Sequence, residues 1–258
     1  MIELGPVEKH LIERTKRGPI VAALIDPEDF SPKQAAETAA KAIDAGVALI
    51  LVGGSTLANQ GRLDAVVKVV KSHTKAHSGH SKSHDVPVIL FPGNITGVSR
   101  YADAILFSSL LNSMNPYFII GAQALGAIEV YKSKIESIPM GYLVFGNNSA
   151  TSFIGQVNSL PTSKPNLAAI YALAAKYLGM RTLYLEAGSG SDEPIPKETI
   201  QAVSRVYDGT LIVGGGITTP EAAARATMAG ADILVIGNLL QSSGFETELS
   251  QITRAAKR

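Results

Sequence analysis

The sequence predicts a (βα)8 barrel, also called a TIM barrel, formed by a single domain over residues 1–258. Eight short apolar runs rich in Val, Ile and Leu recur along the chain, and they do not alternate with polar residues, which is typical of strands buried on both faces. Helical patterns lie between most of these runs, so the strands are expected to be parallel. An open doubly wound sheet is the alternative. The barrel is favoured because polar residues or glycines end nearly every run, whereas an open sheet gathers them at one switch point.

The predicted strands are 19–27, 47–55, 86–94, 103–111, 140–148, 181–189, 209–217 and 231–239. A helix is predicted over 31–46, with Ser31 as its N-cap, Pro32 at its first position and Gly46 just past its end. Further helices are predicted at about 59–72, 116–135, 166–178, 196–206, 219–229 and 243–257. Only residues 95–102 separate the third and fourth strands, which is too short for a covering helix. We therefore expect the third covering helix to be missing or replaced by an extended segment, with an opening in the barrel wall.

Composition excludes several classes of protein. The formal net charge is +1, from 23 basic and 22 acidic residues, and no basic run suggests a nucleic-acid partner. The chain has no cysteine, which excludes disulfides, thiol nucleophiles and thiolate metal sites. The first 18 residues carry charges throughout, unlike a signal peptide, and no apolar run of about 20 residues could span a membrane. These features predict a soluble cytoplasmic protein.

The segment 71–85 contains four of the five histidines. Their spacing would suit a metal ion if the segment were helical. Gly79 and the serines around it favour a solvated loop instead, placed before a strand and therefore at the end of the barrel away from the chemistry. The role of the His/Ser-rich part, 73–85, is left open.

The last three strand ends resemble a phosphate cradle. YLEAGSG (184–190), GGGITTPEA (214–222) and IGN (236–238) place glycines where backbone N–H groups can approach an anion ahead of a helix. Barrel enzymes often bind a phosphate after strands seven and eight. The alternative is that these are only tight turns, which also need glycine. Because no Lys or Arg lies at these ends, the amides would bind a monoester phosphate.

Two carboxylates complete the ring of strand ends. Asp26 follows the first strand and Ser55 follows the second, and such oxygens suit Mg²⁺, which takes one or two carboxylates together with substrate phosphate oxygens. Asp26 could instead simply cap a turn. Glu186 ends the sixth strand, where it could accept a proton or bind a substrate hydroxyl. The alternative for Glu186 is a solvated loop carboxylate.

Several motifs together resemble one family. They are LIDPED (24–29), LILVGGST (49–56), FPGN (91–94), NPYFIIGAQ (115–123), YLEAGSG (184–190), LIVGGGI (211–217) and VIGN (235–238). Over essentially its whole length the chain resembles the geranylgeranylglyceryl phosphate synthases of archaea and, less closely, the bacterial heptaprenylglyceryl phosphate synthases. GGGI alone recurs in many phosphate-binding barrels, but its combination with YLEAGSG and GN is specific.

The resemblance implies a prenyltransferase of archaeal ether-lipid and phospholipid biosynthesis. Such an enzyme joins geranylgeranyl diphosphate to the 3-hydroxyl of sn-glycerol 1-phosphate and releases diphosphate. The resemblance implies Mg²⁺ held by Asp26 and Ser55, catalytic roles for Glu186 and Asp26, and a homo-oligomer, dimer or hexamer. The residues implied to bind glycerol 1-phosphate are Tyr184, Leu185, Glu186, Ala187, Gly188, Ser189, Gly190, Gly214, Gly215, Gly216, Gly237 and Asn238.

The prenyl tail would need an apolar groove, and a lipid product implies transient contact with a membrane surface. Candidate groove residues, which could equally be core residues, are Leu106, Phe107, Tyr117, Ile120, Tyr142 and Val144. The alternatives are a barrel isomerase or synthase acting on a small phosphosugar, a related synthase of different chain length, and a non-enzymatic phosphate-binding barrel. The first is disfavoured because the strand ends carry no lysine for acid–base work, and the last would not need Asp26 and Ser55 opposite the cradle.

Overall fold

The protein is a closed barrel. A computed structural model describes residues 3–56, 59–77, 86–146, 149–188, 190–191 and 193–257. Across these residues eight parallel strands pair in chain order, and the last pairs with the first, which confirms the predicted barrel. The strands are β1 (Ile20–Ile25), β2 (Leu49–Val52), β3 (Val88–Leu90), β4 (Ala104–Leu110), β5 (Glu136–Val144), β6 (Thr182–Glu186), β7 (Thr210–Gly214) and β8 (Ile233–Ile236).

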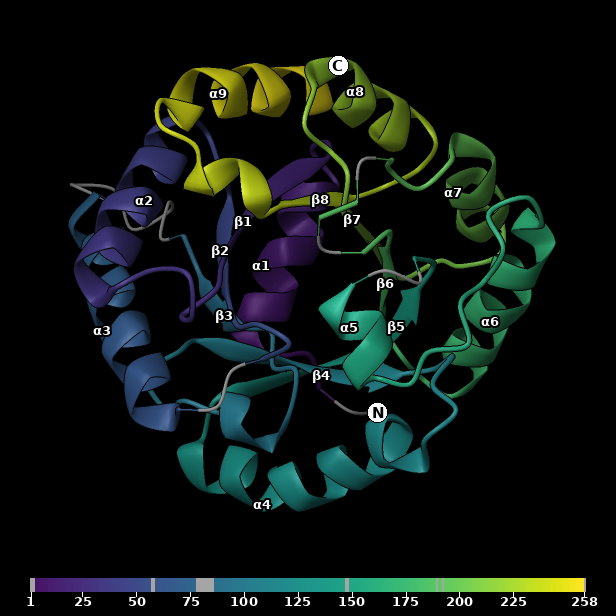
Figure 1. The fold of residues 1–258 in the computed structure, drawn as a ribbon, viewed down its shortest axis with the longest axis horizontal. Helices are drawn as coiled ribbons and strands as arrows, with labels where there is room; N and C mark the ends of the chain where they lie inside the picture. The colour runs from purple at the N-terminus through teal and green to yellow at the C-terminus, as the bar shows by residue number, and fades with distance from the viewer. Residues whose placement is uncertain are drawn as a thin grey trace.

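Helices form a ring outside the strands (Figure 1). The α-helices are α1 (Pro6–Thr15), α2 (Pro32–Asp44), α3 (Gln60–His77), α4 (Ala122–Ser133), α5 (Ala150–Ile154), α6 (Pro165–Tyr177), α7 (Lys197–Ser204), α8 (Pro220–Met228) and α9 (Phe245–Ala256). Short 3₁₀ or π turns are η1 (Ile95–Gly97), η2 (Tyr117–Gly121) and η3 (Asn238–Gln241). Ser31 caps α2 as predicted, in a reciprocal arrangement with Gln34.

Helix α3 is longer than the sequence suggested. It continues to His77, so the expectation of a loop from residue 71 was wrong for residues 71–77. The physical reason is that its buried face continues, because Thr74 lies one turn beyond Val70 and both are buried. Residues 78–85 of the histidine-rich segment lie outside the described residues. Within the described ranges, no group of three or more His, Asp or Glu side chains could hold a metal ion.

The third covering helix is missing, as expected. Between β3 and β4 the chain makes only the short turn η1 and then passes through turns and bends at 100–103 into β4. The neighbouring helix α4, which follows the π turn η2, contacts η1 from the side. The barrel wall next to β4 is therefore covered by α4 and η1 in place of a helix of its own.

Side chains of the strands alternate between two buried layers. Inward residues such as Leu51, Leu106 and Met140 fill the barrel, while outward ones such as Ile50 and Val213 pack against the helices. Each fully buried Leu or Ile contributes about 1.5–3 kcal/mol by leaving water. The barrel is thus a packed core, and it holds the strand ends in fixed positions.

Helix α1, which the sequence did not reveal, closes the end of the barrel where the strands begin. Its Leu11 is buried with the barrel interior. Glu136, the first residue of β5, accepts hydrogen bonds from the backbone N–H groups of Val7 and Glu8, at 2.7 and 2.8 Å, and so caps the helix. The buried Glu8 carboxylate forms a two-point ion pair with Arg181, with both N–O distances at 2.7 Å. These contacts fix α1 in place at the end opposite the mouth.

Candidate active site

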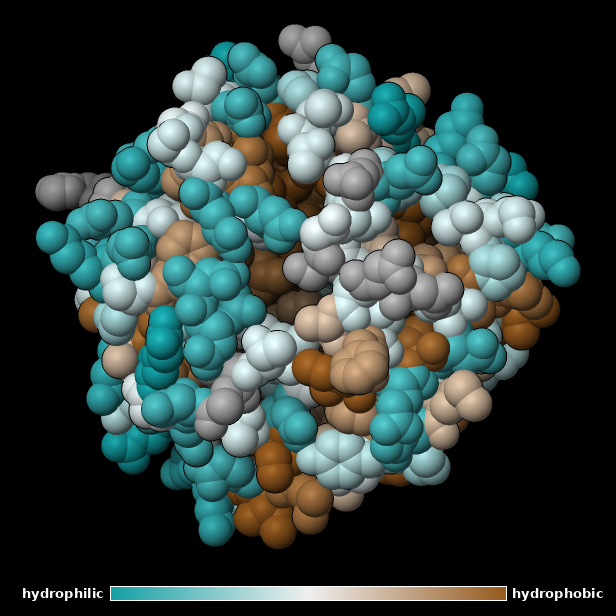
Figure 2. Space-filling model, viewed as in Figure 1, coloured by the Kyte–Doolittle hydropathy of each residue, from teal (hydrophilic) through white to brown (hydrophobic). Residues whose placement is uncertain are grey.

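A pocket opens at the carboxyl ends of the strands. Figure 2 shows it as a hollow near the centre of the face, with hydrophobic surface inside and hydrophilic side chains on much of the rim. It brings together three side chains predicted separately from the sequence: Asp26 after β1, Ser55 after β2 and Glu186 at the end of β6. Oxygen ligands and a potential base therefore share one cavity.

Asp26 is held in a turn and against the next strand end. Its Oδ1 accepts a hydrogen bond from the backbone N–H of Glu28 at 2.9 Å, so it does cap a turn, as the alternative interpretation held. Its other oxygen, Oδ2, lies so close to Gly54 that a Cβ there would be 1.9 Å away. Burial raises the pKa of Asp26; the Glu28 amide opposes this, and the nearby Asp29 and Glu28 carboxylates add to it. Burial thus destabilises the negative charge of this carboxylate more than its one hydrogen bond stabilises it.

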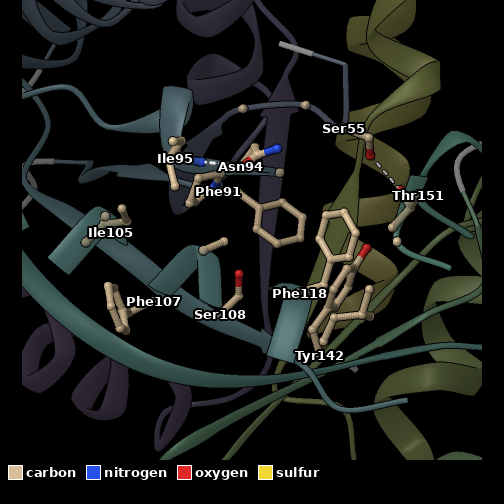
Figure 3. Close-up of a pocket in the computed structure, with 18 of the residues that line it drawn as sticks. Ser55, Phe91, Asn94, Ile95, Ile105, Phe107, Ser108, Phe118, Tyr142 and Thr151 are labelled. Carbon is tan, nitrogen blue, oxygen red and sulfur yellow. Dashed lines mark hydrogen bonds between the residues drawn. The ribbon is translucent and has the colours of Figure 1, made fainter. Parts of the chain in front are cut away.

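Ser55 has a partner from across the mouth. Its Oγ lies 2.7 Å from Oγ1 of Thr151 on α5 (Figure 3). Asp26 and Ser55 offer only oxygen, the donor that Mg²⁺ prefers, and they include a single carboxylate. These residues fit a Mg²⁺ ion that takes its remaining ligands from substrate phosphate and water. Thr151 itself was not expected from the sequence, and nothing in its local pattern identifies it.

Glu186 is a buried carboxylate that faces the pocket. Its side chain accepts a hydrogen bond from the N–H of Gly188 at 2.7 Å and another from the Tyr184 hydroxyl. Burial raises the pKa of Glu186, and these two hydrogen bonds counteract part of the effect. A carboxylate with a raised pKa is a better proton acceptor than a solvated one. The alternative of a solvated loop carboxylate is wrong, because the residue is 7% exposed.

The two residues before Glu186 are not exposed at the mouth. Tyr184 is completely buried inside the barrel. Leu185 is buried on the other side of β6, in the layer that packs against the helices. In this conformation the Tyr184 side chain cannot contact a ligand directly. It can affect a ligand only indirectly, through its hydrogen bond to Glu186. Leu185 can contribute only its backbone.

The predicted cradle lies next to Glu186, at the ends of β6, β7 and β8. Gly188, Gly190, Gly215 and Gly216 all adopt the left-handed backbone conformation, with φ between 69° and 115°. A Cβ on Gly215 would lie 2.6 Å from Oε1 of Glu186, so only glycine fits there. Consecutive left-handed turns direct N–H groups into a concavity that suits an anion.

The remaining predicted cradle residues are close by. Gly214 ends β7 and Gly237 follows β8, with Asn238 beginning η3. Ala187 is buried beside Gly215, while Ser189 lies outside the described residues. These residues do not line the pocket that contains Asp26, Ser55 and Glu186.

Aromatic rings form a wall of the site. Phe91, at the end of β3, stacks on Tyr184 with ring centroids 5.2 Å apart and meets Tyr142 edge-on at 5.4 Å. Phe91 and Tyr142 both line the pocket that also holds Asp26 and Glu186. The sequence analysis did not assign a role to Phe91. Its position directly before PGN at a strand end could have predicted that it lines the mouth.

From this wall an apolar groove runs between η1 and α4, over β4, where the third covering helix is missing. Figure 3 places Phe107 and Ile105 at the end of the pocket away from Ser55 and Thr151. The apolar or glycine residues that line this part are Ile95, Val98, Ile105, Phe107, Ala122, Gly126 and Val130. Of the six residues expected from the sequence only Phe107 and Tyr142 line the pocket. The other four are Leu106 and Val144, which are core residues, Tyr117, which donates a hydrogen bond to Asn94, and Ile120, which is exposed.

Comparisons with known proteins agree on one family. The model of the PcrB family matches residues 12–256. The chain is 47% identical to geranylgeranylglyceryl phosphate synthase of Thermococcus kodakarensis, over all of both chains. It is 49% identical to the enzyme of the same name from Cenarchaeum symbiosum, over 98% of both chains. Its structure is similar to that of (S)-3-O-geranylgeranylglyceryl phosphate synthase from Thermoplasma acidophilum in complex with sn-glycerol-1-phosphate, with a TM-score of 0.90 and 36% identity over 98% of this chain and 99% of the other.

Proposed function

This chain belongs to the PcrB family, and from that premise we propose that it is a geranylgeranylglyceryl phosphate synthase with the catalytic arrangement given below. The enzyme transfers the geranylgeranyl group of geranylgeranyl diphosphate to the 3-hydroxyl of sn-glycerol 1-phosphate, in archaeal ether-lipid synthesis. The observation that supports the arrangement best is the convergence of Asp26, Ser55 and Glu186 in one cavity that continues into an apolar groove. A cation site, a base and a place for a long tail are what the reaction requires.

The glycerol phosphate binds at the ends of β6, β7 and β8. The left-handed glycines Gly188, Gly190, Gly215 and Gly216 turn their N–H groups toward the phosphate, with help from Asn238. Glu186 lies beside this cradle and contacts the 3-hydroxyl. Because the phosphate is fixed at one end of the small molecule, the reacting hydroxyl is held at the other, and such orientation accounts for a large part of the rate.

Asp26 and Ser55 would hold a Mg²⁺ ion, and an ion bound there would neutralise charge on the leaving diphosphate. Asp26 supplies the charge and Ser55 a neutral oxygen, while Arg62 holds the loop after Asp26 by donating hydrogen bonds to the carbonyl oxygens of Pro27 and Glu28. The tail lies in the groove beside Phe107.

The reaction breaks the bond between the first prenyl carbon and the diphosphate oxygen, and the diphosphate leaves with the electron pair. The glycerol oxygen forms the new ether bond to that carbon. Its proton passes to the Glu186 carboxylate, which returns it to water after product release. The largely apolar lining of the pocket disfavours competing water near the prenyl carbon.

Replacing Glu186 with glutamine tests the assignment. The variant should lose about 10²-fold or more in kcat, the scale of a general base, with the product measured by extracting labelled glycerol 1-phosphate into organic solvent. Wild-type activity should fall as the pH drops through the raised pKa of Glu186, because only the ionised form accepts the proton. The variant should lack this acid limb. A full rate in Glu186→Gln would remove Glu186 from the mechanism, and full activity in EDTA would remove Mg²⁺.

We also assign a homo-oligomer, dimer or hexamer. Large apolar side chains are exposed on two outer helices: Leu125, Ile128 and Tyr131 on α4, and Ile170 and Tyr177 on α6, each at least 61% exposed. Figure 2 shows hydrophobic surface over α4. Exposed apolar patches of this kind mark interfaces between proteins. Light scattering should give a mass above that of one chain, and Ile128→Asp should reduce it; a wild-type monomer at micromolar concentration would contradict the assignment.

The location that fits this chemistry is the cytoplasm, with transient contact at a membrane surface. Among the helices that the structure describes, none has both the length and the apolar character needed to cross a membrane. The product nevertheless carries a C20 tail and must reach a lipid layer. Sedimentation with vesicles should therefore recover little of the free enzyme and more of it during turnover.

A further inference from the structure

The contact between Ser55 and Thr151 joins two parts of the mouth that are far apart in sequence. The two hydroxyl oxygens are 2.7 Å apart across 96 residues. Ser55 follows β2, Thr151 lies on α5 above β5, and both line the same pocket as Asp26. Figure 3 shows the two side chains pointing toward one another at the end of the pocket opposite Phe107.

Helix α5 holds Thr151 firmly. At its start Ser149 and Ser152 form a reciprocal cap. Just past its end, Ser113 donates a hydrogen bond to the carbonyl oxygen of Gly155 at 2.6 Å and pairs with Val157 in an isolated β-bridge. The start of the five-residue helix is therefore capped from within, and its C-terminal end is tied to the segment that follows β4. Thr151 presents its hydroxyl from a rigid support.

A serine that binds a cation through its oxygen must direct its proton elsewhere. A neutral hydroxyl has one proton and two lone pairs, and only a lone pair can face the metal. The groups around a metal ligand commonly set its orientation in this way. In this pocket the Ser55 hydroxyl forms its hydrogen bond with the hydroxyl of Thr151.

We propose that Thr151 is a positioning residue that accepts the Ser55 proton and so turns the Ser55 lone pairs toward the cation beside Asp26. The proton of Thr151 is then directed toward the hydroxyl of Tyr142, which lines the same pocket. The chain Ser55–Thr151–Tyr142 links the metal site to the aromatic wall. This inference rests on the proposed role of Asp26 and Ser55 as metal ligands.

The test compares Thr151→Val, which keeps the shape and removes the hydroxyl, with Thr151→Ser, which keeps the hydroxyl. Binding of Mn²⁺ in the presence of inorganic diphosphate is followed by the electron paramagnetic resonance signal of free Mn²⁺, with Asp26→Asn as the reference for a lost ligand. Thr151→Val should bind the ion about 10-fold or more weakly, the usual effect of removing a partner of a metal ligand, and Thr151→Ser should stay close to wild type.

Further measurements separate positioning from structure. The thermal midpoint of Thr151→Val should stay near that of wild type, and KM for glycerol 1-phosphate should not change, while the Mg²⁺ concentration for half-maximal activity rises with the Mn²⁺ dissociation constant. Thr151→Val with wild-type Mn²⁺ affinity, or Thr151→Ser as weak as Thr151→Val, overturns the role of Thr151 alone. Equal Mn²⁺ binding by wild type and Asp26→Asn overturns the metal assignment as well.

Discussion

Replacing Gly54 with alanine should move the Asp26 carboxylate while leaving the barrel intact. A Cβ at Gly54 would lie 1.9 Å from Oδ2 of Asp26, whereas ordinary contact begins at 3.4 Å, so the carboxylate must retreat by about 1.5 Å. The Gly54 backbone is not left-handed, so alanine adds no conformational strain there. The lost hydrogen bond from the Glu28 N–H costs about 1 kcal/mol of stability. A displacement of about 1 Å in a reacting group lowers rates on the order of 10²-fold.

The assay is formation of the extractable ether product across a Mg²⁺ titration. Gly54→Ala should lower kcat/KM for the prenyl diphosphate by about 10²-fold and raise the Mg²⁺ requirement, with KM for glycerol 1-phosphate unchanged. Gly61→Ala is the matched control, because a Cβ there comes no closer than 3.3 Å to any other group. If Gly54→Ala behaves like Gly61→Ala, the carboxylate position does not matter and the metal assignment to Asp26 is wrong.

Three other substitutions probe the cradle, the groove and the far end of the barrel. Gly215→Ala would place a Cβ 2.6 Å from Oε1 of Glu186, so KM for glycerol 1-phosphate should rise at least about 10-fold, which steady-state kinetics will measure; an unchanged KM would place the phosphate elsewhere. Phe107→Ala should widen the groove, so the kcat/KM for a longer prenyl diphosphate divided by that for geranylgeranyl diphosphate should rise about 10-fold or more; an unchanged quotient would mean that the tail does not contact Phe107. Glu8→Gln should lower the free energy of unfolding in urea by about 1.5–3 kcal/mol through its lost pairing with Arg181, without changing kcat; a drop in kcat would show that the two ends of the barrel are coupled.

Local patterns were enough for the strands, the covering helices and the side chains at the strand ends. Runs such as ILVI at 233–236 are buried on both faces, so their composition identifies them without tertiary information. Asp26 and Glu186 could be assigned to one mouth because parallel strands end at the same edge.

Contacts between distant segments could not be predicted. Helix α1 depends on Glu136, 129 residues from Val7, and its place at the barrel end depends on the pairing of Glu8 with Arg181. The Thr151 contact arises in the same way, from the fold and not from a motif. Tyr184 illustrates a third difficulty. Alternation along a strand predicts that its side chain points into the barrel, but not that it lies too deep to be exposed at the mouth.

Because the connection between β3 and β4 is short, the apolar groove lies on a different side of the pocket from the glycine loops at the ends of β6, β7 and β8. The loops proposed to bind the polar head of the substrate tolerate almost no change, since several of their glycines have no room for a methyl group. The groove proposed for the tail is lined by aliphatic residues of η1, β4 and α4, where one side chain can be exchanged for another of different size. Lipid length can consequently evolve at one side of the scaffold while the ether-forming chemistry stays fixed at the other.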